Sequence, residues 1–139
     1  SNYTLTVKTV SGTGLALPIG STTVLYSDGT NITGKLQTKG YYTPSATYTT
    51  VNGDQVLIDT SGGGIGTPIT INLPASPAIG NEVHFIDSGN NLASNNLTIG
   101  RNSSKILGGT SDLVVSANGS AFTLVYVNAT LGWVYKDKI

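Results

Sequence analysis

The sequence of 139 residues contains no cysteine, which excludes disulfide bonds and leaves the redox compartment unspecified. Charged residues make up only 10% of the chain, against roughly 25% in ordinary soluble domains. The formal net charge is zero, so the chain lacks the basic surface expected of a nucleic-acid-binding protein. It also lacks a run of about 18 apolar residues, so the sequence predicts no membrane span.

Methionine is absent as well, even at position 1, and the chain opens in mid-pattern at Ser1-Asn2-Tyr3. We therefore expect a fragment or processed piece of a longer protein. The 18 glycines stand among many threonine, serine and asparagine residues. This composition predicts a surface built from hydroxyls, amides and backbone, with few ion pairs.

Helical periodicity is missing over the 11 or so residues that would be needed to argue for a helix. Short alternating runs recur instead, such as Ile69-Thr-Ile-Asn-Leu73, and turn residues bound them. The sequence therefore predicts an all-β fold of short antiparallel strands, either a β-sandwich, a jelly roll or a β-prism.

Three segments differ in their pattern. Residues 1–34 contain alternating runs and the turn pair Asp28-Gly29, and they predict a small N-terminal β element. Residues 35–50 lose this rhythm and are expected to form a linker or crossing segment. Residues 51–139 resume it and predict a C-terminal β domain.

The stretch from Asp112 to Lys136 predicts a three-stranded meander. Asn118-Gly119 favours a two-residue hairpin turn, because both turn positions need positive φ. The expected register pairs Val115 with Phe122 and Leu113 with Leu124. At the second turn two registers stay open: one places Trp133 opposite Val127, and the other places Tyr135 opposite Tyr126.

The middle strand of this meander, residues 121–127, is apolar on both faces. Its inner face would carry Phe122, Leu124 and Tyr126. The opposite face is expected to meet another copy of the chain, and its residues are Ala121, Thr123, Val125 and Val127.

Catalytic and metal-binding patterns are weak. His84 is the only histidine, and Glu82 and Asp87 are the nearest carboxylates, but no known catalytic spacing surrounds them. A strand histidine hydrogen-bonded at a surface or interface is the simpler interpretation. The aspartates are dispersed beside Gly, Asn, Ser or Thr, which is typical of turns and not of a Ca²⁺ loop. We expect no catalytic residue, no metal and no cofactor.

Aromatic residues offer another lead. Exposed rings beside asparagine or aspartate could stack on sugar rings, whereas buried rings would fill a core or an interface. The rings in question are Tyr41, Tyr42, Tyr126, Trp133 and Tyr135. For the single tryptophan, packing is the more frequent outcome.

Several segments resemble bacteriophage tail fibre and other virion fibre proteins. The N-terminal ones are Leu5-Thr-Val-Lys-Thr9 and Val24-Leu-Tyr-Ser-Asp-Gly-Thr-Asn31. The later ones are Val56-Leu-Ile-Asp-Thr60, Ile71-Asn-Leu-Pro-Ala-Ser-Pro-Ala-Ile-Gly80, Asn95-Asn-Leu-Thr-Ile-Gly-Arg-Asn102, Phe122-Thr-Leu-Val-Tyr-Val127 and Gly132-Trp133. The similarity covers most of the chain and is weakest over residues 35–50. These motifs are structural, and the family has no shared catalytic residues to carry over.

The resemblance implies a homotrimeric distal module of a virion fibre, extracellular, with residues 1–34 ending a preceding module. It would attach the phage to a host cell-surface glycan or protein receptor, without acting as an enzyme. A purely structural trimerisation or capping module is the alternative, and a polysaccharide depolymerase is a third. Specificity would come from the loops 88–95 and 128–132 at one end. The candidate receptor-binding residues are Tyr41, Tyr42, Asn90, Asn91, Asn128 and Trp133.

Overall fold

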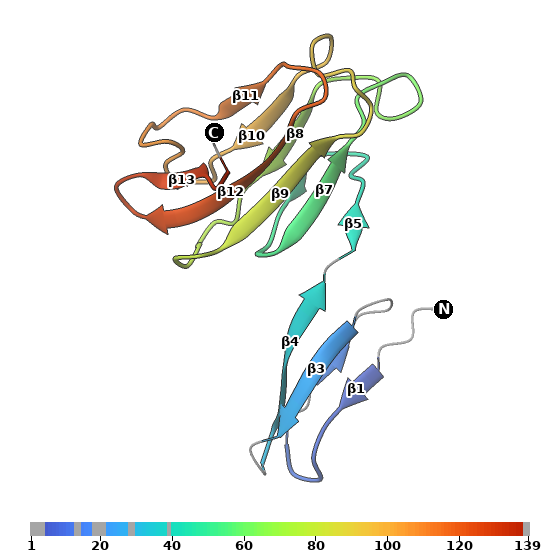
Figure 1. Ribbon diagram of the computed structural model, residues 1–139, viewed down its shortest axis with the longest axis vertical. Coiled ribbons are helices and arrows are strands. Elements are labelled where there is room, and N and C mark those ends of the chain that lie inside the picture. Colours follow the sequence, from blue (N-terminus) through green and yellow to red (C-terminus); the bar gives the residue numbers. More distant parts are fainter. Residues whose placement is uncertain (1–4, 13–14, 18–21, 28–29, 39, 138–139) are drawn as a thin grey trace. The chain divides into compact units, whose positions relative to one another are not determined.

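Figure 1 shows a computed structural model of the chain, which describes residues 5–12, 15–17, 22–27, 30–38 and 40–137. The chain divides into two compact units, residues 1–40 and residues 41–139. The expected boundaries at residues 34 and 50 are therefore wrong. Strand β4 continues through residue 38, and residues 41–50 supply the first two strands of the C-terminal unit.

The N-terminal unit contains two antiparallel strand pairs. β1 pairs with β2, and β3 pairs with β4. The bounds are Leu5–Val7 for β1, Leu15–Leu17 for β2, Thr22–Ser27 for β3 and Ile32–Thr38 for β4. These strands coincide with part of the alternating runs of residues 1–34, while β4 extends beyond that range and the turn pair Asp28-Gly29 lies outside the described residues.

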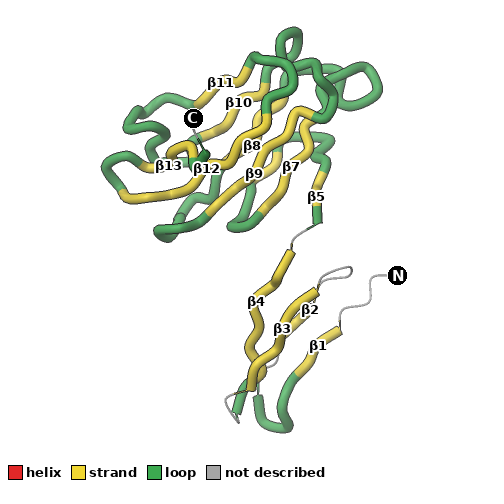
Figure 2. Tube along the Cα trace, viewed as in Figure 1, coloured by secondary structure: helices red, strands yellow, loops and turns green. Residues whose placement is uncertain are grey.

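The C-terminal unit packs two sheets face to face, and Figure 2 shows only strands and loops in its described residues. The first sheet has the order β13-β12-β9-β7-β5, and the second has the order β11-β10-β8-β6. The strands of the first sheet are β5 (Tyr41–Tyr42), β7 (Asp54–Ile58), β9 (Glu82–Asp87), β12 (Ala121–Asn128) and β13 (Gly132–Tyr135). Those of the second are β6 (Tyr48–Thr49), β8 (Ile69–Asn72), β10 (Leu97–Gly100) and β11 (Leu113–Val115). The predicted all-β fold is confirmed.

From β5 to β10 the chain crosses to the other sheet after every strand. As a result β5, β7 and β9 run parallel in one sheet, and β6, β8 and β10 run parallel in the other. The expectation of antiparallel strands is wrong for this half, which winds in successive turns as a short solenoid does. We call β5 to β10 the coils. Parallel neighbours need a long crossover, and here the opposite sheet provides it.

The last three strands close the stack, and we call β11–β13 the cap. β11 pairs antiparallel with β10, and β12 pairs antiparallel with β9. The predicted hairpin between β11 and β12 is therefore wrong, because the two strands belong to different sheets. Gly119 does have positive φ, at 71°, but its turn carries the chain across the sandwich. Its N–H donates to Asp87 Oδ2 at 2.9 Å, which fixes the crossing.

β12 and β13 form the second antiparallel pair of the cap. Their register places Trp133 opposite Tyr126 and Tyr135 opposite Leu124, with an irregularity before Asn128. Neither of the two expected registers is correct. The observed one directs Trp133 into the core, where the edges of the Tyr126 and Trp133 rings meet at a centroid distance of 5.7 Å.

The core lies between the two sheets. Burial alternates along β7, β8 and β9, so that every second residue points inward. The buried apolar side chains are Val56, Ile58, Ile69, Ile71, Leu73, Val83, Phe85, Leu92, Leu97, Ile99, Ile106, Leu124 and Trp133. Each contributes about 1.5–3 kcal/mol of gross stabilisation, and together they fix which face of each strand is left outside.

Candidate functional site

The outer face of the first sheet carries a polar row that crosses four strands. Tyr41 pairs with Gln55, Gln55 with His84, and His84 with Thr123. Paired residues share one face of a sheet, and their neighbours along the strands, such as Val56, Phe85 and Leu124, point into the core. The row therefore places an aromatic ring, an amide, an imidazole and a hydroxyl side by side.

A groove follows this row. Its volume is about 250 Å³, and it is lined by Gly53, Asp54, Gln55, Glu82, His84 and Thr123. These residues come from the start of β7, the start of β9 and the middle of β12. Tyr41, with 58% of its surface exposed, continues the row at the outer edge strand.

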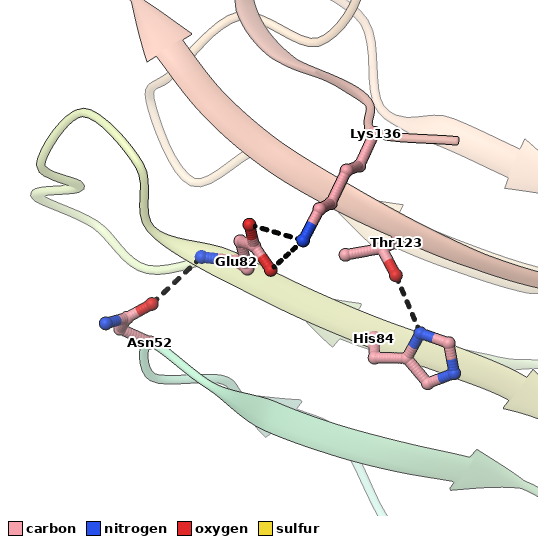
Figure 3. A network of polar contacts seen from close by, with 5 residues as sticks. All are labelled: Asn52, Glu82, His84, Thr123 and Lys136. Carbon is pink, nitrogen blue, oxygen red and sulfur yellow. Dashed lines mark hydrogen bonds and ion pairs between the residues drawn. The ribbon is translucent and has the colours of Figure 1, made fainter. Parts of the chain in front are cut away.

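Two side-chain interactions join the coils to the cap across this groove (Figure 3). His84 Nδ1 lies 2.7 Å from Thr123 Oγ1, and Lys136 Nζ lies 2.9 Å from each Glu82 carboxylate oxygen. Asn52 accepts the backbone N–H of Glu82 through its Oδ1 at 2.9 Å. His84 Nε2 lies on the side of the ring away from Thr123.

One wall of the groove rests on a buried carboxylate. Asp54 is only 7% exposed, and its Oδ2 accepts the Tyr48 hydroxyl at 2.9 Å and the Val51 N–H at 2.8 Å. Burial, followed by the hydrogen bond to Asp54, raises the pKa of Tyr48 to about 12. The Tyr42 ring packs on Tyr48 with a centroid distance of 4.7 Å. This cluster ties β6 to β7 and holds the groove wall in place.

One of the two groove carboxylates, Glu82, is paired with a cation. The hydrogen bond and the charge of Glu82 raise the pKa of Lys136, so the ammonium form persists at neutral pH. Such an exposed pair contributes little to stability, but it orients the carboxylate. The groove thus presents fixed donors and acceptors, which suits hydrogen bonding to hydroxyl groups.

The proposed receptor-binding residues do not form one site. Tyr41 lies in the polar row, while Tyr42 follows the inward parity of Val56 and packs on Tyr48. Trp133 is 0% exposed, so its assignment as a surface receptor contact is wrong. The register required for this burial could not be read from the sequence.

The three asparagines are divided between the two ends of the sandwich. Asn90 and Asn91 follow β9, whereas Asn128 ends β12, which runs antiparallel to β9. The expectation that loops 88–95 and 128–132 lie at one end is therefore wrong. Asn91 donates its Nδ2 to Thr60 O at 3.0 Å, and Asn128 Oδ1 accepts the Thr130 N–H at 2.9 Å. Asn91 thus ties its loop to the loop after β7, and Asn128 shapes its own loop.

The expected interface residues point outward from β12. They alternate with the inward-facing Phe122, Leu124 and Tyr126, and they are Ala121, Thr123, Val125 and Val127. Thr123 contributes to the groove, and the two valines are half-buried. Whether a second copy covers this face stays a prediction.

Sequence reasoning missed Gln55 and Lys136 as members of the site. The shared parity of Glu82 and His84 was a usable signal, since both were assigned to one strand face. Gln55 joins them only through a parallel register 29 residues away, with Asp54 opposite Val83. Such a distant register has no local mark in the sequence.

The described residues contain no group of three His, Asp or Glu side chains that could hold a metal ion. That part of the chain also has no helix long and apolar enough to cross a membrane. Comparison with models of known protein families gives no match, and comparison with curated proteins finds no significant relative.

Proposed function

We propose that this chain is the distal module of a bacteriophage fibre and attaches the virion to a glycan on the host cell surface. The observation that carries the proposal is the groove on the outer face of the first sheet. Its amide, imidazole and hydroxyl groups lie in line with the exposed Tyr41, and the Glu82 carboxylate lies beside them. Polar groups that converge beside an aromatic ring match a sugar, which has hydroxyls at its rim and apolar C–H faces.

The groove is organised before any ligand arrives. His84 is held by Thr123 and Glu82 by Lys136, so their side chains lose little freedom on binding. The zero net charge of the chain favours a ligand recognised by short hydrogen bonds over one attracted by long-range electrostatics. A neutral glycan fits both properties.

The fibre context rests on the resemblance of the strand and turn segments to virion fibre proteins. With it come an extracellular position on the virion and a trimeric assembly. Half-buried Val125 and Val127 on the outer face of β12 support contact with a second copy. These two valines lie beyond Thr123 along β12, so a neighbour could cover them beside the groove.

We propose adhesion and not catalysis. Both groove carboxylates already have partners: Asp54 accepts from Tyr48 and Val51, and Glu82 is bound by Lys136. A glycoside hydrolase would need one carboxyl as an acid and the other free to act as base or nucleophile. Release of reducing ends from a bound polysaccharide would overturn this part of the proposal.

The test is binding of the full chain to a glycan array and to whole bacterial cells. Tyr41→Ala is expected to weaken binding by roughly tenfold, since it removes the ring that continues the groove. The matched control is Val114→Ala, which removes a side chain of similar exposure (56%) from the second sheet, away from the groove, and is expected to leave affinity unchanged. Equal losses in the two variants would contradict the groove, and an absence of binding to every glycan and cell would contradict adhesion.

A structural capping role is the second candidate, and the outward valines of β12 favour it. Solution mass separates the outcomes in combination with the binding assay. A trimer that binds glycans supports the fibre adhesin, whereas a trimer that binds nothing supports a capping module. A monomer at all concentrations would contradict the trimeric assembly in both.

A further inference from the structure

A second and larger hollow lies beyond the end of β7. Its volume is about 440 Å³. The residues that line it come from the loop after β5 and from the glycine-rich loop after β7, and they are Thr43, Pro44, Ser45, Asp59, Gly63, Gly64 and Ile65. Two hydroxyls and a carboxylate thus face an apolar wall made by proline and isoleucine.

Asp59 is seated in this hollow by its neighbours. Its Oδ1 accepts the Ser61 N–H at 2.9 Å and the Ser61 hydroxyl at 2.5 Å. Two glycines leave the necessary space: a Cβ at Gly64 would collide with the backbone and carboxyl group of Asp59, and one at Gly89 would collide with its Oδ1. Two positions next to the half-buried Asp59 are therefore glycine, and its carboxylate makes no ion pair with the described residues that line the hollow.

The groove lies at the start of β7, and the hollow lies just beyond its end. Gln55, Leu57 and Asp59 alternate with the buried Val56 and Ile58, so all three face outward. Gln55 and Asp59 are four residues apart, which along a strand is about 13 Å. The edge strand β5 runs parallel to β7 with Tyr41 opposite Gln55, and Thr43 and Ser45 follow β5 in the crossover to β6. The groove, which crosses the strands at Gln55, and the hollow at Asp59 are therefore connected by the outward face of β7.

We propose that the groove and the Asp59 hollow form one extended site for a linear neutral glycan of several sugar residues, with Asp59 accepting hydroxyl groups at one end. This inference rests on the proposed function and adds the length of the ligand to it. Leu57 lies between the two depressions on β7, and Tyr41 lies beside Gln55 at the groove; both supply apolar contact for the C–H faces of the sugars.

The charge of the hollow selects against acidic sugars. Among the described residues that line it, Asp59 is the only charged side chain. The hydrogen bonds from the Ser61 hydroxyl and backbone lower the pKa of Asp59, so it stays an anion and an acceptor well below neutral pH. An anionic sugar would be repelled, whereas hydroxyl groups can donate to the carboxylate.

The experiment measures affinity against ligand length. A neutral polysaccharide that the full chain binds is cut into size-fractionated fragments, from one repeat unit upwards, and each is titrated by calorimetry. We expect affinity to rise with length until both depressions are filled. Asp59→Asn is expected to lower affinity for long fragments by roughly tenfold, the value of one hydrogen bond to a charged group, and to leave the shortest fragments unaffected.

Two controls isolate the hollow. Asp137→Asn removes the same charge from an exposed position outside both depressions and is expected to change nothing. Gly64→Ala should displace Asp59 and reproduce the loss for long fragments, whereas Gly62→Ala meets open space and should not. Thermal melts of all four variants verify folding.

The outcomes separate the two proposals. If short and long fragments bind equally, or if Asp59→Asn binds long fragments as the parent does, the extended site is wrong while adhesion through the groove stands. If no neutral polysaccharide binds the full chain at any length, both proposals fail.

Discussion

The coils and the cap of the C-terminal unit cover the same core, but their strands are connected in different ways. In the coils, β5 to β10, each strand pairs with one from the preceding or following coil, 28 residues away for β8 and β10. In the cap, β12 and β13 pair across a short local turn. The coils therefore depend on crossovers and shared core residues, whereas the cap depends on turn geometry.

The candidate site lies where these two regions meet. β9 is the last coil strand of the first sheet and β12 is its neighbour from the cap. The His84–Thr123 hydrogen bond and the Glu82–Lys136 ion pair both cross this boundary. A groove at such a boundary can vary through the cap strands without changing the coils, which is a useful property for a surface that selects ligands.

The largest predicted effect concerns the tight turn of the cap. Gly132 has φ of 72°, and a Cβ there would fall on the backbone carbonyl of Lys105. Gly132→Ala therefore combines an unfavourable φ with displacement of a packed loop. We expect a loss of about 3 kcal/mol in unfolding free energy, measured by urea denaturation.

Gly80→Ala is the matched control for this turn. Gly80 has φ of 85°, but a Cβ there meets nothing within 4 Å. Only the backbone strain at positive φ should lower the unfolding free energy, by about 1 kcal/mol. Equal losses for the two variants would show that the contact between the Lys105 loop and the cap turn contributes nothing.

A smaller effect is predicted where the chain crosses from β11 to β12. Gly119 has φ of 71°, a conformation that β-branched residues strongly disfavour. Gly119→Val should lower the unfolding free energy by about 2 kcal/mol and weaken the hydrogen bond from the backbone N–H of residue 119 to Asp87. Ala117→Val changes the exposed neighbouring loop residue without this strain and should cost far less. Identical melting temperatures for the two variants would contradict the need for a left-handed residue at the crossing.

The Asn118-Gly119 turn also shows how far sequence reasoning reached. The dipeptide correctly predicted positive φ at Gly119 but not at Asn118, and the predicted pairing of Leu113 with Leu124 is wrong. Both residues do pack against the same core, but from opposite sheets. A hydrophobic pattern specifies which face is buried, and it does not specify whether the burying partner lies beside the strand or across the sandwich.

The prediction of a linker was wrong for residues 41–50 for a different reason. β5 and β6 contain two residues each, which is too short for a period of two to be recognised. Their position is fixed instead by tertiary contacts, in which Tyr48 bonds to Asp54 and Tyr42 packs on Tyr48. The polar row could not be predicted from the sequence either. Three of its residues come from parallel strands, and the register of these strands depends on how all the coils pack.

The smallest predicted effect tests the first coil through its pH dependence. The pKa of Tyr48 is about 12 in the folded chain against an ordinary value of 10.0. Between these values the unfolded chain loses the phenolic proton while the folded chain keeps it, so stability falls as pH rises from 10 to 12.

At neutral pH, Tyr48→Phe should lower the unfolding free energy by about 1 kcal/mol through the lost hydrogen bond to Asp54. Urea denaturation of parent and variant across this range should show the difference shrinking, because alkaline pH removes from the parent the same proton that the substitution removes. A difference that stays constant to pH 12 would mean that the Tyr48 hydroxyl does not hold the first coil to β7, and the coils would then rest on their aliphatic core alone.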